Sequence, residues 1–286
     1  LGYASSTDGE NIDERLHNPA YTPRESFELP NGKPVIAYMS GGGYGGIEDP
    51  RLTKIGNTIY LTYVAFDGCN PPRVALSSID VENFVNKRFT WSKPKLISKP
   101  GVVDKNAVIF PEKIHGKYVI MHRIFPNILV DFVDDLLFEN TYLKGEYKIS
   151  PRQDYWDSRK IGAGAPPIKT DKGWLLIYHA VDDRDASQYK IGAMLLDLEN
   201  PLKILYWSRK PIIIPDMWYD NVGHKSGVVY PCGAVIKNNN LIVYYGGADT
   251  VVCAAKQNIN EFLDLLVASS KVWPDKTIYP VPLRKV

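Results

Sequence analysis

Residues 49–63 of this 286-residue chain read DPRLTKIGNTIYLTY. Two short runs rich in β-branched and aromatic residues flank a Gly56-Asn57 pair, which is the composition of two strands joined by a tight turn. The proline near the start marks the first run as the beginning of a strand. The segment therefore predicts an antiparallel hairpin that starts at Asp49.

Three further segments repeat this pattern of a proline-marked strand, a polar turn and a second strand. They are FPEKIHGKYVIMH at 110–122, PPIKTDKGWLLIYH at 166–179 and YPCGAVIKNNNLIVYY at 230–245. The second strands begin near residues 60, 118, 174 and 241, a period of roughly 55–70 residues. That period fits a four-stranded blade with its loops, so the repeat predicts an all-β chain folded as a five-bladed β-propeller.

A third strand is expected after each hairpin, at 74–80, 191–197 and 251–255 and more weakly within 128–139. The first nine residues resemble that third strand, which leaves five second halves of blades for four first halves. Either residues 270–286 close blade one, or half of it lies upstream of Leu1. We therefore expect one propeller domain over residues 1–286, with blade one incomplete at the N-terminus. An irregular β-sandwich is the alternative, and one helix is expected at 258–269 with Asn260 as its N-cap.

Composition excludes several classes of protein. The net charge is +2, from 34 basic and 32 acidic residues without a long basic run, which disfavours nucleic acid as a partner. No apolar stretch approaches the ~20 residues of a membrane span, and no spacing typical of a metal site is present. Three scattered cysteines disfavour a disulfide framework. We expect a cytoplasmic protein without membrane contact. The composition is compatible with a homo-oligomer.

Two glycine-flanked carboxylates are candidates for function. The inner strands of a propeller converge on one channel, so side chains at their ends can meet there. Asp49 follows Gly45-Gly46 and is fixed by Pro50, although Asp before Pro is also a common turn initiator. Asp249 follows Gly246-Gly247 and could bind sugar hydroxyls or cap a turn.

Four basic residues, Lys105, Arg123, Lys160 and His179, lie near the ends of successive predicted strands. Buried cations at neighbouring positions repel each other unless an anion joins them. Phosphate suits such a site, because arginine offers a fork of donors and lysine a compact charge. The alternative is that each cation pairs separately with a carboxylate.

Long strings along nearly the whole chain resemble glycoside hydrolase family 130, the mannoside phosphorylases and related mannosidases. They are GIEDPRLTKIGNTIYLTY, KNAVIFPEKIHGKYVIMHR, WDSRKIGAGAPPIKTDKGWLLIYHAVD, YKIGAMLLDLENPLKILYWS, VVYPCGAV and VYYGGADTVV. The resemblance implies a five-bladed propeller, in agreement with the repeat. Members usually carry an asparagine and an arginine of the active site in strands that precede the part matched here. Many members also have asparagine where this chain has Gly227.

The resemblance also implies roles for individual residues. Asp49 matches the proton donor, which is thought to act through the 3-hydroxyl of mannose. Arg123, Lys160 and His179 match phosphate-binding positions, Tyr189 is a plausible addition, and Lys105 falls where some members have arginine. The expected sugar-binding residues are Asp249, which matches a mannose-binding residue, with Arg51, Asn106 and Glu48. Inorganic phosphate is the expected co-substrate, and no cofactor or metal is implied.

The expected reaction is inverting phosphorolysis of a terminal β-mannoside to α-mannose 1-phosphate, with a β-mannosyl oligosaccharide as the other substrate. An inverting hydrolase of the same fold is the first alternative, and it would need a second carboxylate as base, taken from Glu48, Glu112 or Asp182. A non-catalytic sugar-binding propeller is the second alternative, although it would gain nothing from a cationic cluster. The sequence leaves the linkage, β-1,4 or β-1,2, and the acceptor sugar open.

Overall fold

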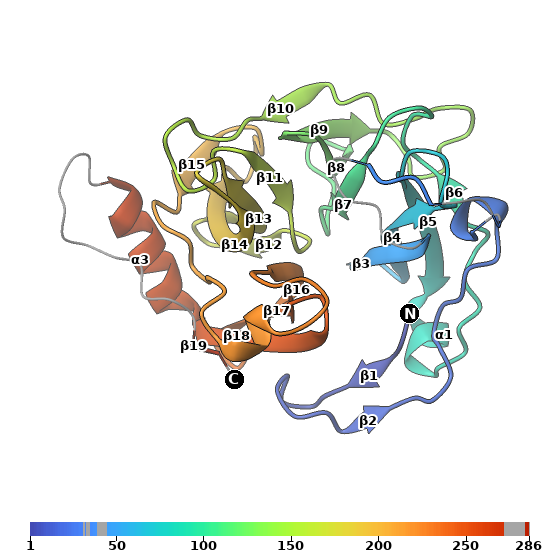
Figure 1. The fold of residues 1–286 in the computed structure, drawn as a ribbon, viewed down its shortest axis with the longest axis horizontal. Helices are drawn as coiled ribbons and strands as arrows, with labels where there is room; N and C mark the ends of the chain where they lie inside the picture. The colour runs from blue at the N-terminus through green and yellow to red at the C-terminus, as the bar shows by residue number, and fades with distance from the viewer. Residues whose placement is uncertain (31, 33–34, 39–44, 272–283, 286) are drawn as a thin grey trace. The chain divides into compact units, whose positions relative to one another are not determined.

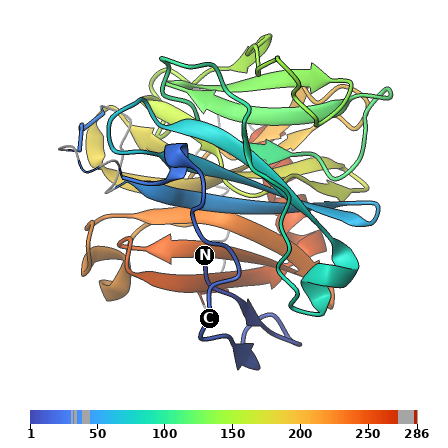
Figure 2. The same cartoon turned by 90° about the vertical axis from the view of Figure 1, so that its right-hand side faces the viewer.

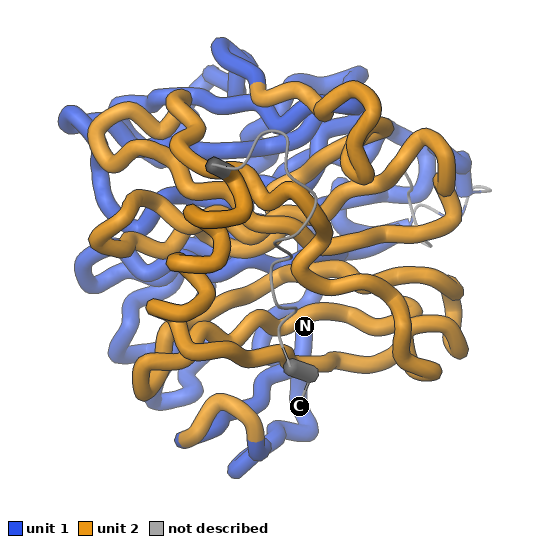
Figure 3. The backbone as a smooth tube through the Cα atoms, turned by 90° about the vertical axis from the view of Figure 1, so that its left-hand side faces the viewer, with its two compact units in different colours: residues 1–7, 11–148 blue, residues 8–10, 149–286 orange. Residues whose placement is uncertain are grey.

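The computed structural model describes residues 1–30, 32, 35–38, 45–271 and 284–285. The chain divides into two compact units, which Figure 3 shows in different colours. Unit 1 comprises residues 1–7 and 11–148, and unit 2 comprises residues 8–10 and 149–286. Each unit is built from antiparallel sheets whose strands follow one another along the chain.

Unit 1 contains two four-stranded sheets and one two-stranded sheet (Figure 1). The first sheet is formed by β3 (Gly46–Ile55), β4 (Thr58–Phe66), β5 (Arg73–Asp80) and β6 (Lys95–Leu96). The second is formed by β7 (Lys105–Ile109), β8 (Tyr118–Ile124), β9 (Asn127–Val133) and β10 (Tyr147–Ile149). The short helix α1 (Val81–Val85) directly follows β5 (Figure 2), and a 3-10 turn, η1 (Ser26–Glu28), precedes β3.

Unit 2 contains a five-stranded and a four-stranded sheet. The first is formed by β11 (Lys160–Ala163), β12 (Ile168–Thr170), β13 (Gly173–Asp182), β14 (Asp185–Leu196) and β15 (Ile204–Trp207). The second is formed by β16 (Val229–Lys237), β17 (Asn240–Gly247), β18 (Val251–Asn258) and β19 (Arg284–Lys285). Helices α2 (Trp218–Asn221) and α3 (Ile259–Lys271) complete the unit.

The four predicted second strands form as β4, β8, β13 and β17, and their apolar residues contribute to the cores. Every residue of β7, β11 and β13 is buried. Helix α3 places Phe262 and Leu266 on the same core cluster as Ile177 and Val243, so the helix is amphipathic and packed against the sheets of unit 2. Its cap is Asn258 and not the predicted Asn260, because the Asn258 side-chain oxygen accepts the N–H groups of Asn260 and Glu261 at 3.0 and 3.2 Å.

Two predicted first strands are wrong in position. Residues 110–114 form no strand, and β7 lies earlier, at Lys105–Ile109. At the third hairpin, Pro166-Pro167 separates β11 from β12, and both of these strands pair with β13. Proline has no N–H to donate to a ladder, so the predicted strand begins only after the two prolines, at Ile168.

The first residues of the chain do not form the third strand of a blade that their sequence predicted. β1 (Ala4–Ser5) pairs with β2 (Glu14–Arg15) in a sheet of their own. At the other end, β19 pairs with β18, so Arg284–Lys285 is the fourth strand of the last sheet. Most of the segment 270–286, which was one candidate to close blade one, lies outside the described residues. Among the helices that the structure describes, none is long and apolar enough to cross a bilayer.

Candidate active-site residues

Asp49 lies in a bulge of β3. The pairing with β4 runs from Glu48 opposite Val64 to Arg51 opposite Thr62, so one extra residue is accommodated between them. Asp49 has a φ of 54°, in the left-handed region, where Asp and Asn are the most tolerated residues after glycine. Its carbonyl oxygen accepts a 2.6 Å bond from Nη1 of the buried Arg51. The bulge and the bond from Arg51 together fix the backbone conformation at Asp49.

Asn106 occupies the corresponding bulge of the next sheet. The β7–β8 register shifts between Lys105 and Val108, and Asn106 has a φ of 58°. Its side-chain Nδ2 lies 3.4 Å from Oδ2 of Asp49, and its Oδ1 accepts a 2.6 Å bond from Nε of Arg123. Arg123, Asn106 and Asp49 therefore form one hydrogen-bonded chain inside unit 1.

The two cations of unit 1 have different electrostatic surroundings. Lys105 and Arg123 are directly opposite each other across the β7–β8 ladder, and both are buried. The Lys105 ammonium lies 3.4 Å from Oε2 of Glu48, so this lysine has a carboxylate partner. Arg123 is only 4% exposed, and its Nη1 has no hydrogen-bond acceptor in the part of the chain that the structure describes. A buried guanidinium nitrogen without an acceptor is costly, so Arg123 is the residue of unit 1 best suited to an anionic ligand.

A buried ionic triad, which the sequence analysis missed, lies beside these residues. The protonated His122 ring donates from both nitrogens, with Nδ1 2.7 Å from Oδ2 of Asp104 and Nε2 3.0 Å from Oδ2 of Asp131. Burial disfavours the charged ring, but the two carboxylates outweigh that cost and raise the pKa of His122 to about 9. His122 precedes Arg123 and Asp104 precedes Lys105, so the triad ties together the strands that carry both cations.

In unit 2, Lys160, His179 and Tyr189 come together on neighbouring strands. Lys160 is the first residue of β11, and its ammonium donates to the Tyr189 hydroxyl. The His179 ring lies 6.0 Å from the Tyr189 ring and 4.5 Å from the ring of Tyr230, measured between centroids. Tyr230 was not predicted as a site residue, although it begins the Tyr-Pro pair of the fourth repeat. These residues combine two cationic or protonatable groups with two phenol rings.

Asp249 lies in the turn between β17 and β18. Ala248 and Asp249 both have left-handed backbone angles, with φ of 48° and 51°, and the Asp249 side chain is exposed. Left-handed residues at consecutive positions are typical of a tight hairpin turn. Asp249 therefore lies in a tight turn, and its predicted contact with sugar hydroxyls stays a prediction.

Of the carboxylates considered as a hydrolytic base, two are engaged in ion pairs. Glu48 is paired with Lys105, and Asp182 is bound by Arg184 through Nε and Nη2, at 3.0 and 2.8 Å. The bond from Arg184 lowers the pKa of Asp182 to about 2, although burial acts in the opposite direction. A general base works best with a pKa near the working pH, so Asp182 is poorly suited to that role.

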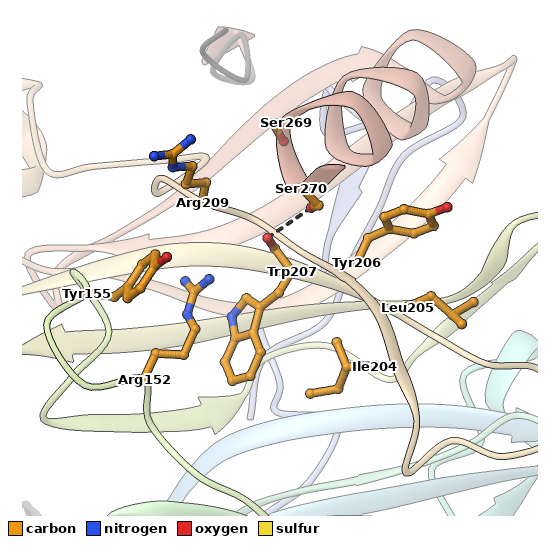
Figure 4. Close-up of a pocket in the computed structure, with 9 residues that line it drawn as sticks. All are labelled: Arg152, Tyr155, Ile204, Leu205, Tyr206, Trp207, Arg209, Ser269 and Ser270. Atoms are coloured by element: carbon orange, nitrogen blue, oxygen red, sulfur yellow. Dashed lines mark hydrogen bonds between the residues drawn. The ribbon is translucent and has the colours of Figure 1, made fainter. Parts of the chain in front are cut away.

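Unit 2 also contains a cavity of about 310 Å³ that involves none of the predicted site residues. It lies between β15 and the end of α3 (Figure 4). The residues around it are Arg152, Tyr155, Ile204, Leu205, Tyr206, Trp207, Arg209, Ser269 and Ser270. The Arg152 guanidinium contacts the rings of Tyr155 and Trp207 and is bound to Asp157, so its charge is already compensated.

Both units thus carry cationic side chains beside a carboxylate or phenol. Such side chains can bind an anionic co-substrate. The comparisons with known proteins agree. A family model described as β-1,4-mannooligosaccharide phosphorylase matches residues 2–268. Two curated relatives come from Thermoanaerobacter sp. strain X514. The chain is 38% identical to a 1,2-β-oligomannan phosphorylase over 89% of its own length and 77% of the relative's, and 36% identical to a β-1,2-mannobiose phosphorylase over 89% and 76%.

A solved structure shows the fold. The β-1,2-mannobiose phosphorylase of Listeria innocua, in complex with β-1,2-mannobiose, has a TM-score of 0.71 at 29% identity over 93% of this chain and 68% of that one. This likeness confirms the predicted all-β propeller, of which the described residues form four sheets of four or five strands and the small β1–β2 sheet. The chain belongs to glycoside hydrolase family 130, and within it to the glycoside phosphorylases.

Proposed function

We propose that this chain cleaves a terminal β-mannoside by phosphorolysis, with inversion, and releases α-mannose 1-phosphate. The observation that carries the proposal is the buried Arg123 guanidinium, whose Nη1 has no acceptor within the described residues. Lys160, Tyr189 and His179 supply a second group of donors in unit 2. Phosphate accepts several charge-assisted bonds at once, which offsets the cost of burying such cations.

The proposed reaction needs one nucleophile and one proton donor. A phosphate oxygen attacks C1 of the mannosyl residue while the bond from C1 to the glycosidic oxygen breaks. Asp49 supplies the proton for the leaving oxygen, through the mannose 3-hydroxyl as the family resemblance implies, and is then reprotonated from solvent. The hydrogen bond from Asn106 and the bulge of β3 hold the Asp49 side chain for this transfer. Phosphate binding by cations takes the place of the base that a hydrolase requires.

We propose β-1,2-linked mannosides as the preferred substrates. The relatives at 38% and 36% identity are both named for β-1,2 linkages. The description of the family model favours the β-1,4 linkage, which is the second candidate. Hydrolysis is less well supported, because Glu48 and Asp182 are both engaged by cations.

Release of mannose 1-phosphate tests the proposal. The purified protein is incubated with β-1,2- and β-1,4-mannobiose, each with and without inorganic phosphate, and free mannose and mannose 1-phosphate are quantified separately. We expect mannose 1-phosphate only when phosphate is present, and faster turnover of the β-1,2 disaccharide. Equal release of free mannose without phosphate would mean that the protein is a hydrolase.

A further inference from the structure

Gly227 brings a loop of unit 2 unusually close to β14. Its φ is 77°, and a Cβ at this position would lie 2.9 Å from the Ser187 carbonyl oxygen. The Gly227 carbonyl accepts a 2.9 Å bond from the Tyr189 N–H, and Val228 forms a parallel bridge with Tyr189. Only glycine allows this approach without strain. Gly227 thus joins the loop to Tyr189.

The same loop is fixed on its other side by the turn that carries Asp249. The Lys225 N–H donates to the Ala248 carbonyl at 3.0 Å, and the Ala248 N–H donates to the Val228 carbonyl at 3.0 Å. The His224 N–H donates to the Thr250 hydroxyl at 2.8 Å. Lys225 therefore lies on a backbone that is tied to both neighbouring segments.

These ties place the Lys225 ammonium 4.7 Å from the centroid of the Tyr189 ring, within the range of a cation–π contact. The Lys160 ammonium lies 4.5 Å from the same centroid and donates to the Tyr189 hydroxyl. No carboxylate pairs with Lys225 among the residues described. Two ammonium groups that contact the same ring repel each other, and an anion that binds to both would relieve that repulsion.

We propose that Lys225 is a further phosphate-binding residue, acting beside Lys160 on the phosphate dianion, either as free phosphate or as the phosphate group of the sugar 1-phosphate. This inference rests on the proposed phosphorolysis and names one more residue of its phosphate site. Lys225 is exposed, so it adds a screened contact at the rim and not a buried ion pair. Its role is to attract and hold the anion, and the chemical step does not pass through it.

The test compares Lys225→Met with Lys203→Met as a matched control. Lys203 is also an exposed lysine of unit 2, paired with Asp197 at 3.7 Å beyond the far end of β14 from Tyr189. We expect Lys225→Met to raise the KM for phosphate about three- to tenfold, the range of an exposed charge-assisted contact. The KM for the sugar 1-phosphate in the synthetic direction should rise similarly. Neither kcat nor the KM for the disaccharide should change more than about twofold, and Lys203→Met should match the wild type.

A second comparison tests the role of the ring. In a Tyr189→Phe background the ring remains, so Lys225→Met should still weaken phosphate binding. In a Tyr189→Leu background the ring is lost, and the same change should have a much smaller effect. An equal effect in both backgrounds would contradict positioning by the Tyr189 ring.

Direct titration of inorganic phosphate by calorimetry separates this inference from the proposed function. If the wild type proves to be a hydrolase, the proposed function fails, but a weaker phosphate affinity of Lys225→Met would still support the site. An unchanged phosphate affinity would overturn the inference. A KM that rises for the disaccharide alone would also overturn it and would assign Lys225 to the acceptor sugar.

Discussion

Replacing Arg123 with methionine should separate phosphate binding from stability. Methionine keeps the apolar stem but removes the charge and every donor. Arg123 is buried, and its Nη1 has no acceptor within the described residues, so it is available for a ligand oxygen. A hydrogen bond to a charged group contributes about 1.5–3 kcal/mol. Its loss should raise the KM for phosphate roughly 10- to 100-fold.

Although Arg123→Met should weaken phosphate binding, it should not lower the stability of the protein when phosphate is absent. Burying a guanidinium without a counter-ion costs several kcal/mol, as an order of magnitude. The bond that Arg123 donates to Asn106, at 2.6 Å, recovers only about 1.5–3 kcal/mol of that cost. Without phosphate, Arg123→Met should therefore unfold at the same temperature as the wild type or at a higher one.

Added phosphate should reverse that order. At 100 times its Kd, a ligand stabilises the folded state by about 2.7 kcal/mol, which corresponds to a rise of about 4–5 °C in Tm for a chain of this length. With a Kd that is 10- to 100-fold weaker, the same phosphate concentration should stabilise Arg123→Met by only about 0.4–1.4 kcal/mol.

Thermal unfolding over a series of phosphate concentrations measures both effects. Arg88→Met is the matched control, because Arg88 is an exposed arginine of unit 1 that is paired with Glu82 at 2.9 Å. The control should keep the full phosphate-dependent shift. A variant at position 123 that is strongly destabilised without phosphate, yet keeps its phosphate shift, would show that Arg123 is structural and would refute the reasoning.

Three further changes have defined outcomes. Asp49→Asn should lower kcat at least about 100-fold at every phosphate concentration while leaving the circular dichroism spectrum unchanged, since the amide cannot donate the proton; activity within tenfold of the wild type would exclude Asp49 as the acid. The raised pKa of His122 should contribute roughly 3 kcal/mol of stability below pH 6.5, lost as the pH rises through about 9, so urea unfolding should show a fall between pH 6 and pH 10 that is absent in His122→Gln. Gly227→Ala should cost about 1–3 kcal/mol of stability and also raise the KM for phosphate, because its Cβ would meet Ser187; an unchanged Tm would contradict this.

Local sequence patterns predicted the hairpins because a turn pair such as Gly56-Asn57 and the apolar runs around it are encoded within a few residues. The same patterns misplaced strands whose position depends on which residues the neighbouring strand pairs with. Residues 110–114 have a strand-like composition, but β8 pairs with Lys105–Ile109 instead. The triad of His122 could not be predicted, because its two carboxylates come from different segments and only the fold brings them to the two ring nitrogens.

Bulges explain how one repeated strand pattern presents different chemistry. In a regular strand, neighbouring side chains point to opposite faces, so the direction of the Glu48 side chain would determine that of the Asp49 side chain. The extra residue at Asp49 in β3 and at Asn106 in β7 breaks that alternation at equivalent places of two successive sheets. Both positions adopt left-handed backbone angles that Asp and Asn tolerate best, so the backbone restricts the residue types available there. The choice between carboxylate and amide then separates the roles, with the first able to donate a proton and the second able to join Asp49 to Arg123.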